Sequence, residues 1–237
     1  MNRKYVAFDI ETAKVLPAEV NDLRAHRPLG ICCAAVLTSL EEEPRLWFGG
    51  FKEQRQNPRM TPEEAGELVS DLERLVQEGF TILTWNGLGF DFEILAEESG
   101  KWDECRRLAR AHVDMMFHAF CELGYPISLD RAALGMRLQG KSKGVEAYLA
   151  PKLWADGRTD EVLAYVGQDV RATLELAFTC EKKRVLRWIA KSGKSQTLDL
   201  NSGWRTAQEA VKLPKPDVSW MKSPIPRSRF TGWLEKS

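Results

Sequence analysis

The chain has 237 residues, 43% hydrophobic and 29% charged, a composition typical of globular proteins and unlike disordered, collagenous or coiled-coil chains. No apolar run approaches the roughly 20 residues that a bilayer span requires. The polar first residues lead straight into a strand-like segment, so a signal peptide is not expected either. The five cysteines form no Cys-x-x-Cys pair, which argues against a disulfide framework or a cysteine zinc site and favours reduced thiols in a cytoplasmic protein.

The formal net charge is zero, but it conceals a division along the chain. Residues 181–237 carry 13 Lys and Arg against 5 Asp and Glu, whereas the first 180 residues carry 21 against 29. The basic segment also holds four of the eight tryptophans, and cations interleaved with aromatic rings suit a nucleic-acid backbone and its bases. Alternatively, the tryptophans pack the segment onto the main domain while its lysines stay solvated, and both can hold at once.

The first half of the chain shows strand patterns interrupted by one helix. Apolar, strand-like segments are expected at residues 4–10, 29–37, 45–48 and 80–85. Thr61, followed by Pro62 and two acids, predicts a helix start, and the helix is expected to end at Gly79. A glycine-containing turn at residues 86–90 then leads into a helix that begins at Asp91.

The second half predicts mostly helix. Helical patterns run over residues 103–123 and from about 159 to 188, with a polar, Lys-rich loop at 135–144 between them. After Ser192 the chain is expected to be irregular. These elements predict an α/β fold with a mixed sheet, divided into a domain at 1–190 and a basic, Trp- and Pro-containing C-terminal extension at 191–237.

A few acids do not fit solvated helix faces. Asp9 and Glu11 lie at the end of the first strand, and alternate strand residues share one face about 7 Å apart, so both carboxylates point the same way. Like charges closing a buried strand repel each other unless a cation lies between them. The alternative is a strand end that emerges into water.

Two further acids each have an ordinary explanation. Asp91 follows the turn at 86–90, where Asp is a common helix N-cap. Asp169 lies inside a predicted helix, four residues after Tyr165 and therefore on the same helix face, a pairing that is often incidental.

Taken together, the order and context of these residues resemble a known pattern. The segments Phe8-Asp9-Ile10-Glu11-Thr12, Asn86 to Asp91, and Tyr165 to Asp169 resemble the three motifs of the DEDD 3′–5′ exonucleases, in the subclass with Tyr. The resemblance is greatest to the exonuclease domains related to family B DNA polymerases, although no polymerase domain follows in this chain. It implies a ribonuclease-H-like mixed β-sheet flanked by helices, and it covers residues 4 to about 178.

The resemblance implies a two-metal mechanism. Phosphodiester hydrolysis needs charge stabilisation on the attacking and leaving oxygens, which two divalent ions about 3.5–4 Å apart can supply. Asp9 would bridge both ions, Glu11 and Asp169 would hold the ion that activates water, and Asp91 would support the second ion. Tyr165 would orient the attacking water, because its ordinary pKa of about 10 makes it a poor general base. An all-oxygen site favours Mg²⁺ or Mn²⁺.

Substrate contacts are also expected around these acids. Thr12 and the turn from Asn86 to Phe90 should border the terminal nucleotide, with Phe90 either a stacking partner or a core residue. Lys141 and Lys143 either meet phosphates or stay solvated. Asp114 is considered as an acid that supports the others, outside the main set.

The activity implied is a metal-dependent 3′–5′ exonuclease that releases mononucleotides from single-stranded 3′ ends. DNA is favoured over RNA only through the polymerase-like resemblance, and no membrane partner is expected. The alternatives are a non-catalytic nucleic-acid-binding relative and an endonuclease of the same fold. Removing residues 192–237 is expected to weaken binding, unless the extension is structural.

Overall fold

A five-stranded mixed sheet with the order β3-β2-β1-β4-β5 lies at the centre of the computed structural model. The central strand β1 (Lys4–Thr12) is antiparallel to β2 (Ile31–Thr38) and parallel to β4 (Phe80–Thr84). The edges are β3 (Arg45–Phe48) and the two-residue β5 (Val113–Asp114). The structure describes residues 3–17, 20, 22–53, 57–138 and 147–235.

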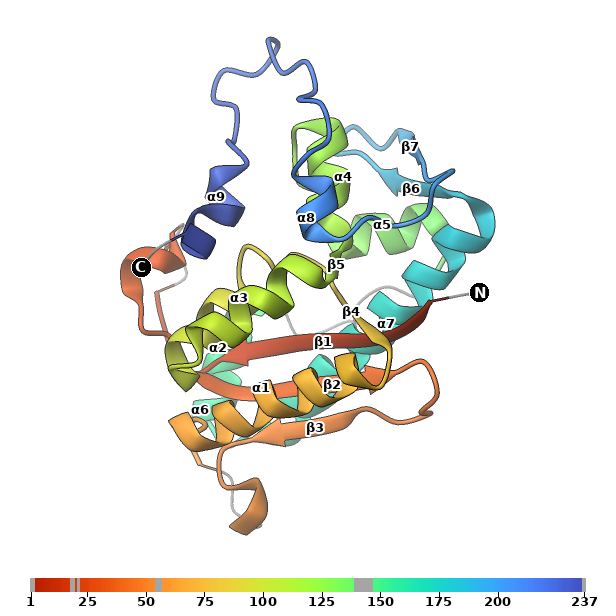
Figure 1. The fold of residues 1–237 in the computed structure, drawn as a ribbon. Helices are drawn as coiled ribbons and strands as arrows, with labels where there is room; N and C mark the ends of the chain where they lie inside the picture. Colours follow the sequence, from red (N-terminus) through yellow and green to blue (C-terminus); the bar gives the residue numbers. More distant parts are fainter. Residues whose placement is uncertain (1–2, 18–19, 21, 54–56, 139–146, 236–237) are drawn as a thin grey trace.

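Helices cover both faces of this sheet (Figure 1). One face packs against α1 (Pro62–Gln77), α2 (Asp91–Ser99) and α3 (Trp102–Ala111). The other packs against α6 (Ala150–Ala155) and the long α7 (Thr159–Lys183). Near the β5 edge lie α4 (Met115–Leu123) and α5 (Leu129–Met136). Short 3-10 turns occur at Leu23–His26 (η1), Phe51–Glu53 (η2) and Ala147–Leu149 (η3).

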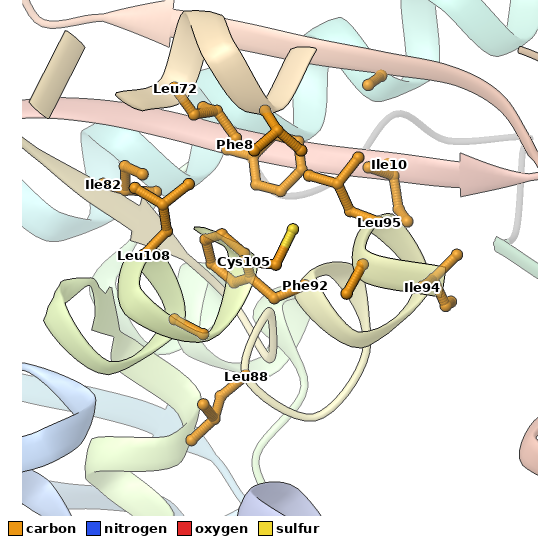
Figure 2. Close-up of a cluster of buried hydrophobic side chains, with 14 of the residues drawn as sticks. Phe8, Ile10, Leu72, Ile82, Leu88, Phe92, Ile94, Leu95, Cys105 and Leu108 are labelled. Atoms are coloured by element: carbon orange, nitrogen blue, oxygen red, sulfur yellow. The ribbon is translucent and has the colours of Figure 1, made fainter. Parts of the chain in front are cut away.

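The alternation of side chains along β1 determines which residues point to each face of the sheet. Val6, Phe8 and Ile10 enter the apolar cluster beneath α1 and α2, where Figure 2 shows the Phe8 ring close to Phe92. Ala7 packs instead in the cluster formed with α6 and α7. Because strand side chains alternate with period two, Asp9 and Glu11 belong to the same face as Ala7 and therefore lie toward α7.

The predictions for the first half of the chain are confirmed in element type and order. The four expected strands are β1, β2, β3 and β4, and α1 begins where Thr61 predicted it. The Thr61 hydroxyl accepts a hydrogen bond from the Glu64 amide while the Glu64 carboxylate accepts one from the Thr61 amide, a reciprocal cap.

The helix predicted over residues 103–123 is wrong as one element. His112 has an extended backbone, and Val113 pairs with Leu83 in the parallel edge strand β5. Asp114 then caps α4 through the Phe117 amide, which starts a new helix in a different direction.

The helix predicted to reach Trp188 also ends early, at Lys183. Arg184 adopts a left-handed backbone conformation (φ 52°) that stops α7, and the chain turns into β6 (Val185–Ile189). The loop predicted from Gly135 begins later, because α5 continues to Met136. Residues 139–146 of that predicted loop lie outside the described part of the chain.

The prediction of an irregular chain after Ser192 is corrected by a β-hairpin. β6 pairs antiparallel with β7 (Ser195–Asp199) across a turn in which Gly193 has a positive φ of 80°. The predicted division at residue 190 falls between these two strands. Two short helices, α8 (Ala207–Ala210) and α9 (Ser228–Thr231), and the 3-10 turn η4 (Gly232–Glu235) follow.

The C-terminal extension is packed into the main domain through large aromatic residues. Trp204 is buried beside α4 and α7, while Phe230 and Trp233 enter the cluster that contains α2 and α3. Within the described ranges, no helix combines the length and apolar character that crossing a membrane would require.

Candidate active site

Three carboxylates converge on the α7 face of the sheet. Asp9 and Glu11 come from the end of β1, and Asp169 comes from the middle of α7. One ligand oxygen from each lies within 4.8 Å of the others. Glu11 and Asp169 are buried and Asp9 is half-buried, so the cluster opens at Asp9.

These acids fit a divalent cation. Like charges held this close in a buried setting are costly unless a cation compensates them. All the ligand atoms are carboxylate oxygens, which hard divalent ions prefer. Asp9, Glu11 and Asp169 could therefore hold metal.

Asp91 joins this cluster from a second element. It is the first residue of α2 and is buried, and its Oδ1 accepts a hydrogen bond from the Ile10 amide at 3.0 Å. A further hydrogen bond links its carboxyl group to that of Asp9, and burial raises the pKa of Asp91 to about 7. The N-cap position belongs to Phe90, which makes no capping bond through its side chain, so Asp91 does not have the ordinary N-cap role considered above.

Tyr165 lies one helical turn before Asp169, on the same face of α7, and is buried. Gly167 between them faces Pro44, where an added Cβ would be 3.3 Å from the proline Cγ. The absence of a side chain at this position lets α7 lie close to the residues at the start of β3.

The turn at residues 86–90 is organised by Asp114. Its Oδ1 accepts hydrogen bonds from the amides of Asn86 and Phe117, and its Oδ2 accepts one from Leu88, each at 2.9 Å. Burial raises the pKa of Asp114 to about 6. Asp114 was outside the main predicted set, although an acid inside the otherwise apolar stretch of residues 113–117 is itself a signal for such a role.

A neutral histidine supports the same turn. His112 Nδ1 lies 2.6 Å from the Ala109 carbonyl oxygen and its Nε2 lies 3.1 Å from Thr84 Oγ1, which in turn accepts a hydrogen bond from the Gly87 amide. The carbonyl contact places the proton on Nδ1, so Nε2 accepts from the threonine hydroxyl. Burial lowers the pKa of His112 to about 4, which keeps the ring neutral at physiological pH.

A cleft of about 1090 Å³ opens from the acids. Asp9, Asn86 and Asp169 line it at the acid cluster, and several aromatic rings, including Trp85, line the remainder. A second, smaller cavity of about 510 Å³ lies across the turn, where Asn86, Gly89 and Phe90 face η1 and the segment before α9. Asn86 therefore borders both spaces.

The residues predicted to contact substrate lie in different parts of the structure. Asn86 lines the main cleft, whereas Phe90 lines the smaller cavity and also packs on the apolar cluster beneath α2. Thr12 ends β1 directly after Glu11, where the register with β2 shifts. Lys141 and Lys143 lie outside the described residues.

The fold and the acid-lined cleft define a ribonuclease-H-like α/β protein. Residues 46–180 match the model of the RNase_H superfamily, and the chain belongs to that superfamily. This membership supports a nuclease-type function on nucleic acid. No curated protein matches the chain.

A solved structure has a similar fold. The family B DNA polymerase from the hyperthermophilic archaeon Pyrobaculum calidifontis is similar with a TM-score of 0.52 and 22% sequence identity. The match covers 76% of this chain and 25% of the polymerase, so the chain spans about a quarter of that protein's length. The similarity extends the agreement in fold to most of the chain.

Proposed function

We propose that this protein is a metal-dependent 3′–5′ exonuclease that hydrolyses single-stranded nucleic acid, DNA in preference to RNA, to mononucleotides. The observation that carries the proposal is the convergence of Asp9, Glu11 and Asp169 within 4.8 Å, with Asp91 hydrogen-bonded to the same strand. A protein that only binds nucleic acid has no use for four buried or half-buried acids around one point, because carboxylates without a metal ion repel phosphates.

Each acid has a role that its position supports. Asp9, at the open end of the cluster, would be shared by two divalent ions, while Glu11 and Asp169 would hold the first and Asp91 the second. Bound Mg²⁺ or Mn²⁺ would supply charge stabilisation and a water of lowered pKa. The backbone hydrogen bond from Ile10 to Asp91 fixes the distance between α2 and β1, so the carboxylates are oriented before any ion enters.

Tyr165 would hold the attacking water through its hydroxyl group. It is buried on a long helix and shares a face with Asp169, so its ring has little freedom. A phenol with a pKa near 10 orients water at neutral pH more effectively than it removes a proton.

The turn at residues 86–90 would receive the terminal nucleotide. Asn86 borders the cleft beside Asp9, and its backbone is fixed at a positive φ of 77° by the Asp114 hydrogen bond. Thr12 and Phe90 would contribute from the two sides of this turn.

The direct test uses single-stranded DNA and RNA oligonucleotides labelled at either end. The full chain is incubated with Mg²⁺, with Mn²⁺ and with chelator. A 3′-labelled strand should release labelled mononucleotide from the first time point, and a 5′-labelled strand should shorten stepwise, only when metal is present. Absence of hydrolysis with every strand and metal would contradict the proposal and favour a non-catalytic binding protein.

The endonuclease alternative requires a different substrate. A closed circular single strand has no end, so an exonuclease leaves it intact while an endonuclease opens it. We expect the circle to survive under conditions that degrade a linear strand of the same sequence.

A further inference from the structure

We propose that the C-terminal extension forms the second wall of the cleft and that Trp220, beside Tyr125, stacks on bases of the substrate strand upstream of its terminal nucleotide. This inference rests on the proposed function for the position of the strand end at the acids. It assigns a binding role to residues that lie beyond the superfamily match, which ends at residue 180.

The cleft continues from the acid cluster onto the extension. Beyond Asp9 and Asp169 its lining includes Tyr125, Trp188 and Trp220. The Tyr125 ring stands edge-on to both tryptophans, with centroids 6.5 Å from Trp188 and 6.1 Å from Trp220. The three rings thus form a continuous aromatic row that ends at the surface.

Trp220 is the exposed end of this row. Its side chain is 67% exposed, whereas Trp188 at the inner end is only 3% exposed. Exposing a large indole to water is unfavourable because of the hydrophobic effect. At the mouth of an acid-lined cleft, a nucleic-acid base stacked on the Trp220 ring would bury that surface. Stacking accepts any base, because every base has a π face.

The arm that carries Trp220, residues 214–226, is held in place at both ends. In Figure 1 it rises between α8 and α9, beyond α4. Arg227 donates hydrogen bonds to four backbone carbonyl oxygens, those of Cys121, Val211, Leu213 and Pro214. Val218 lies so close to Gly124 that a Cβ there would be 2.3 Å from Val218 Cγ1. Trp220 is therefore positioned beside Tyr125 by close packing of the arm on the end of α4.

Two cations lie along the same cleft. Arg131 and Lys191 both line it, and Arg131 Nη1 also donates to the Ile189 carbonyl oxygen at the end of β6. Positive side chains in the lining of this cleft suit the phosphates of a strand whose bases face the rings. A base-stacked, single-stranded polynucleotide matches this combination, since the bases of a duplex already stack on each other.

The test separates base stacking from other contributions to binding. The full-length Trp220→Ala variant is compared with wild type for binding, in chelator, to a labelled single strand of about ten nucleotides. A second strand of equal length keeps only its 3′-terminal base and is abasic elsewhere. We expect Trp220→Ala to weaken binding of the normal strand about tenfold and to leave binding of the abasic strand unchanged.

Matched variants provide the controls. Trp220→Phe should retain most of the affinity, because a phenyl ring still stacks. Phe51→Ala removes another exposed aromatic ring, in η2 beyond the β3 edge, and should change neither affinity. With metal present, Trp220→Ala should raise KM for the normal strand while kcat stays within about twofold.

The two proposals fail separately. Equal binding of the normal strand by wild type and Trp220→Ala overturns this inference even if the wild type hydrolyses DNA. A base-dependent loss of binding in a protein that hydrolyses nothing supports the inference and contradicts the exonuclease. An equal loss of affinity for both strands also overturns it, because that result assigns Trp220 a structural role.

Discussion

The two walls of the cleft are built differently. The proposed metal-binding side chains of one wall come from the central strand β1 and the long helix α7, whereas the aromatic rings proposed to line the other come from a hairpin and an arm. Asp9 and Glu11 lie on β1, which has apolar clusters on both sides, and Asp169 lies on α7, which shares one of these clusters. Trp220 lies on an arm fixed by Arg227 and by contacts with α4. The first wall is therefore part of the core itself, whereas the second is a surface segment held against the core by a few contacts.

The difference corresponds to what each wall has to do. Carboxylates that hold metal ions must keep their positions to a fraction of an ångström, which core elements can provide. A ring that stacks on a flexible strand must be available but need not be fixed as closely. Mutations in the first wall should therefore abolish chemistry, and mutations in the second should change binding or folding.

The largest effect is expected from Asp9→Ala. Loss of the carboxylate that two ions would share should lower kcat by about a thousandfold or more, because the metal contribution is worth several kcal/mol. Binding of single-stranded DNA in chelator should remain nearly unchanged. Stopped assays on end-labelled strands measure the first effect and fluorescence anisotropy the second.

The matched control is Asp160→Ala, which removes an exposed acid in the first turn of α7. It should keep wild-type turnover. Unaltered hydrolysis by Asp9→Ala would show that the acid cluster is not the site of chemistry.

The next effect concerns how the second wall is anchored. Trp204 is fully buried, with its indole edge-on to His118 and its Nε1 directed at the Ala177 carbonyl oxygen. Trp204→Ala should lower the free energy of unfolding by about 3–5 kcal/mol, the usual cost of deleting a buried aromatic side chain. Trp220→Ala, at an exposed position, should change it by no more than about 0.5 kcal/mol. Urea denaturation of both variants tests this contrast.

The burial of Trp204 also changes the result expected from deleting the C-terminal extension. Deleting residues 192–237 removes Trp204, Phe230 and Trp233 from the core, so we expect a chain that does not fold rather than one that binds weakly. A folded truncated chain would instead show that the extension is only a surface attachment.

The next prediction is a pH dependence of the free energy of unfolding that arises from His112, the residue that supports the turn at 86–90 beside the acids. The folded-state pKa of His112 is lowered from 6.5 to about 4 by burial, so its contribution to stability is present above pH 6.5 and is lost as the pH falls toward 4. Asp114, with its pKa raised to about 6, acts in the opposite direction over this range. Comparison with His112→Gln cancels that second contribution.

Between pH 7.5 and 4.5 the wild type should lose about 2 kcal/mol more of its unfolding free energy than His112→Gln does. Denaturation curves of both proteins at the two pH values give this difference. Equal losses would mean that His112 titrates normally in the folded state.

An effect of similar size is expected where the hairpin meets α5. A Cβ on Gly135 would lie 2.4 Å from the Arg187 carbonyl oxygen and from Trp188 Cα, both backbone atoms of β6. Gly135→Ala should therefore push the hairpin away and destabilise the protein by about 1–3 kcal/mol. In Gly232→Ala the added methyl group meets no atom within 4 Å and should have almost no effect. Similar melting temperatures for the two variants would contradict the close packing of α5 on β6.

The parts of the fold that the sequence predicted are those governed by local patterns. Three such features depend only on neighbouring residues. They are the shared strand face of Asp9 and Glu11, the four-residue spacing of Tyr165 and Asp169, and the helix cap at Thr61. The structure brings Asp9, Glu11 and Asp169 together and holds Asp91 against Asp9, while the catalytic roles of these residues and of Tyr165 stay predictions.

The features that the sequence did not predict depend on distant partners. β5 has two residues, too few for a periodic signal, and it exists because Val113 pairs with Leu83. Arg184 ends α7 in a left-handed conformation that its residue type does not indicate. The position of Trp220 depends on how Val218 packs on Gly124, a contact between residues far apart in the chain.

The four carbonyl contacts of Arg227 have a consequence for how the protein can change. They fasten the two ends of the arm to each other and to α4, whatever sequence lies between them. Residues 215–225 could therefore be replaced by another sequence without disturbing the acids or the sheet. Relatives that keep an arginine at this point could carry arms of other lengths and chemistry, and could acquire new strand preferences while conserving one reaction.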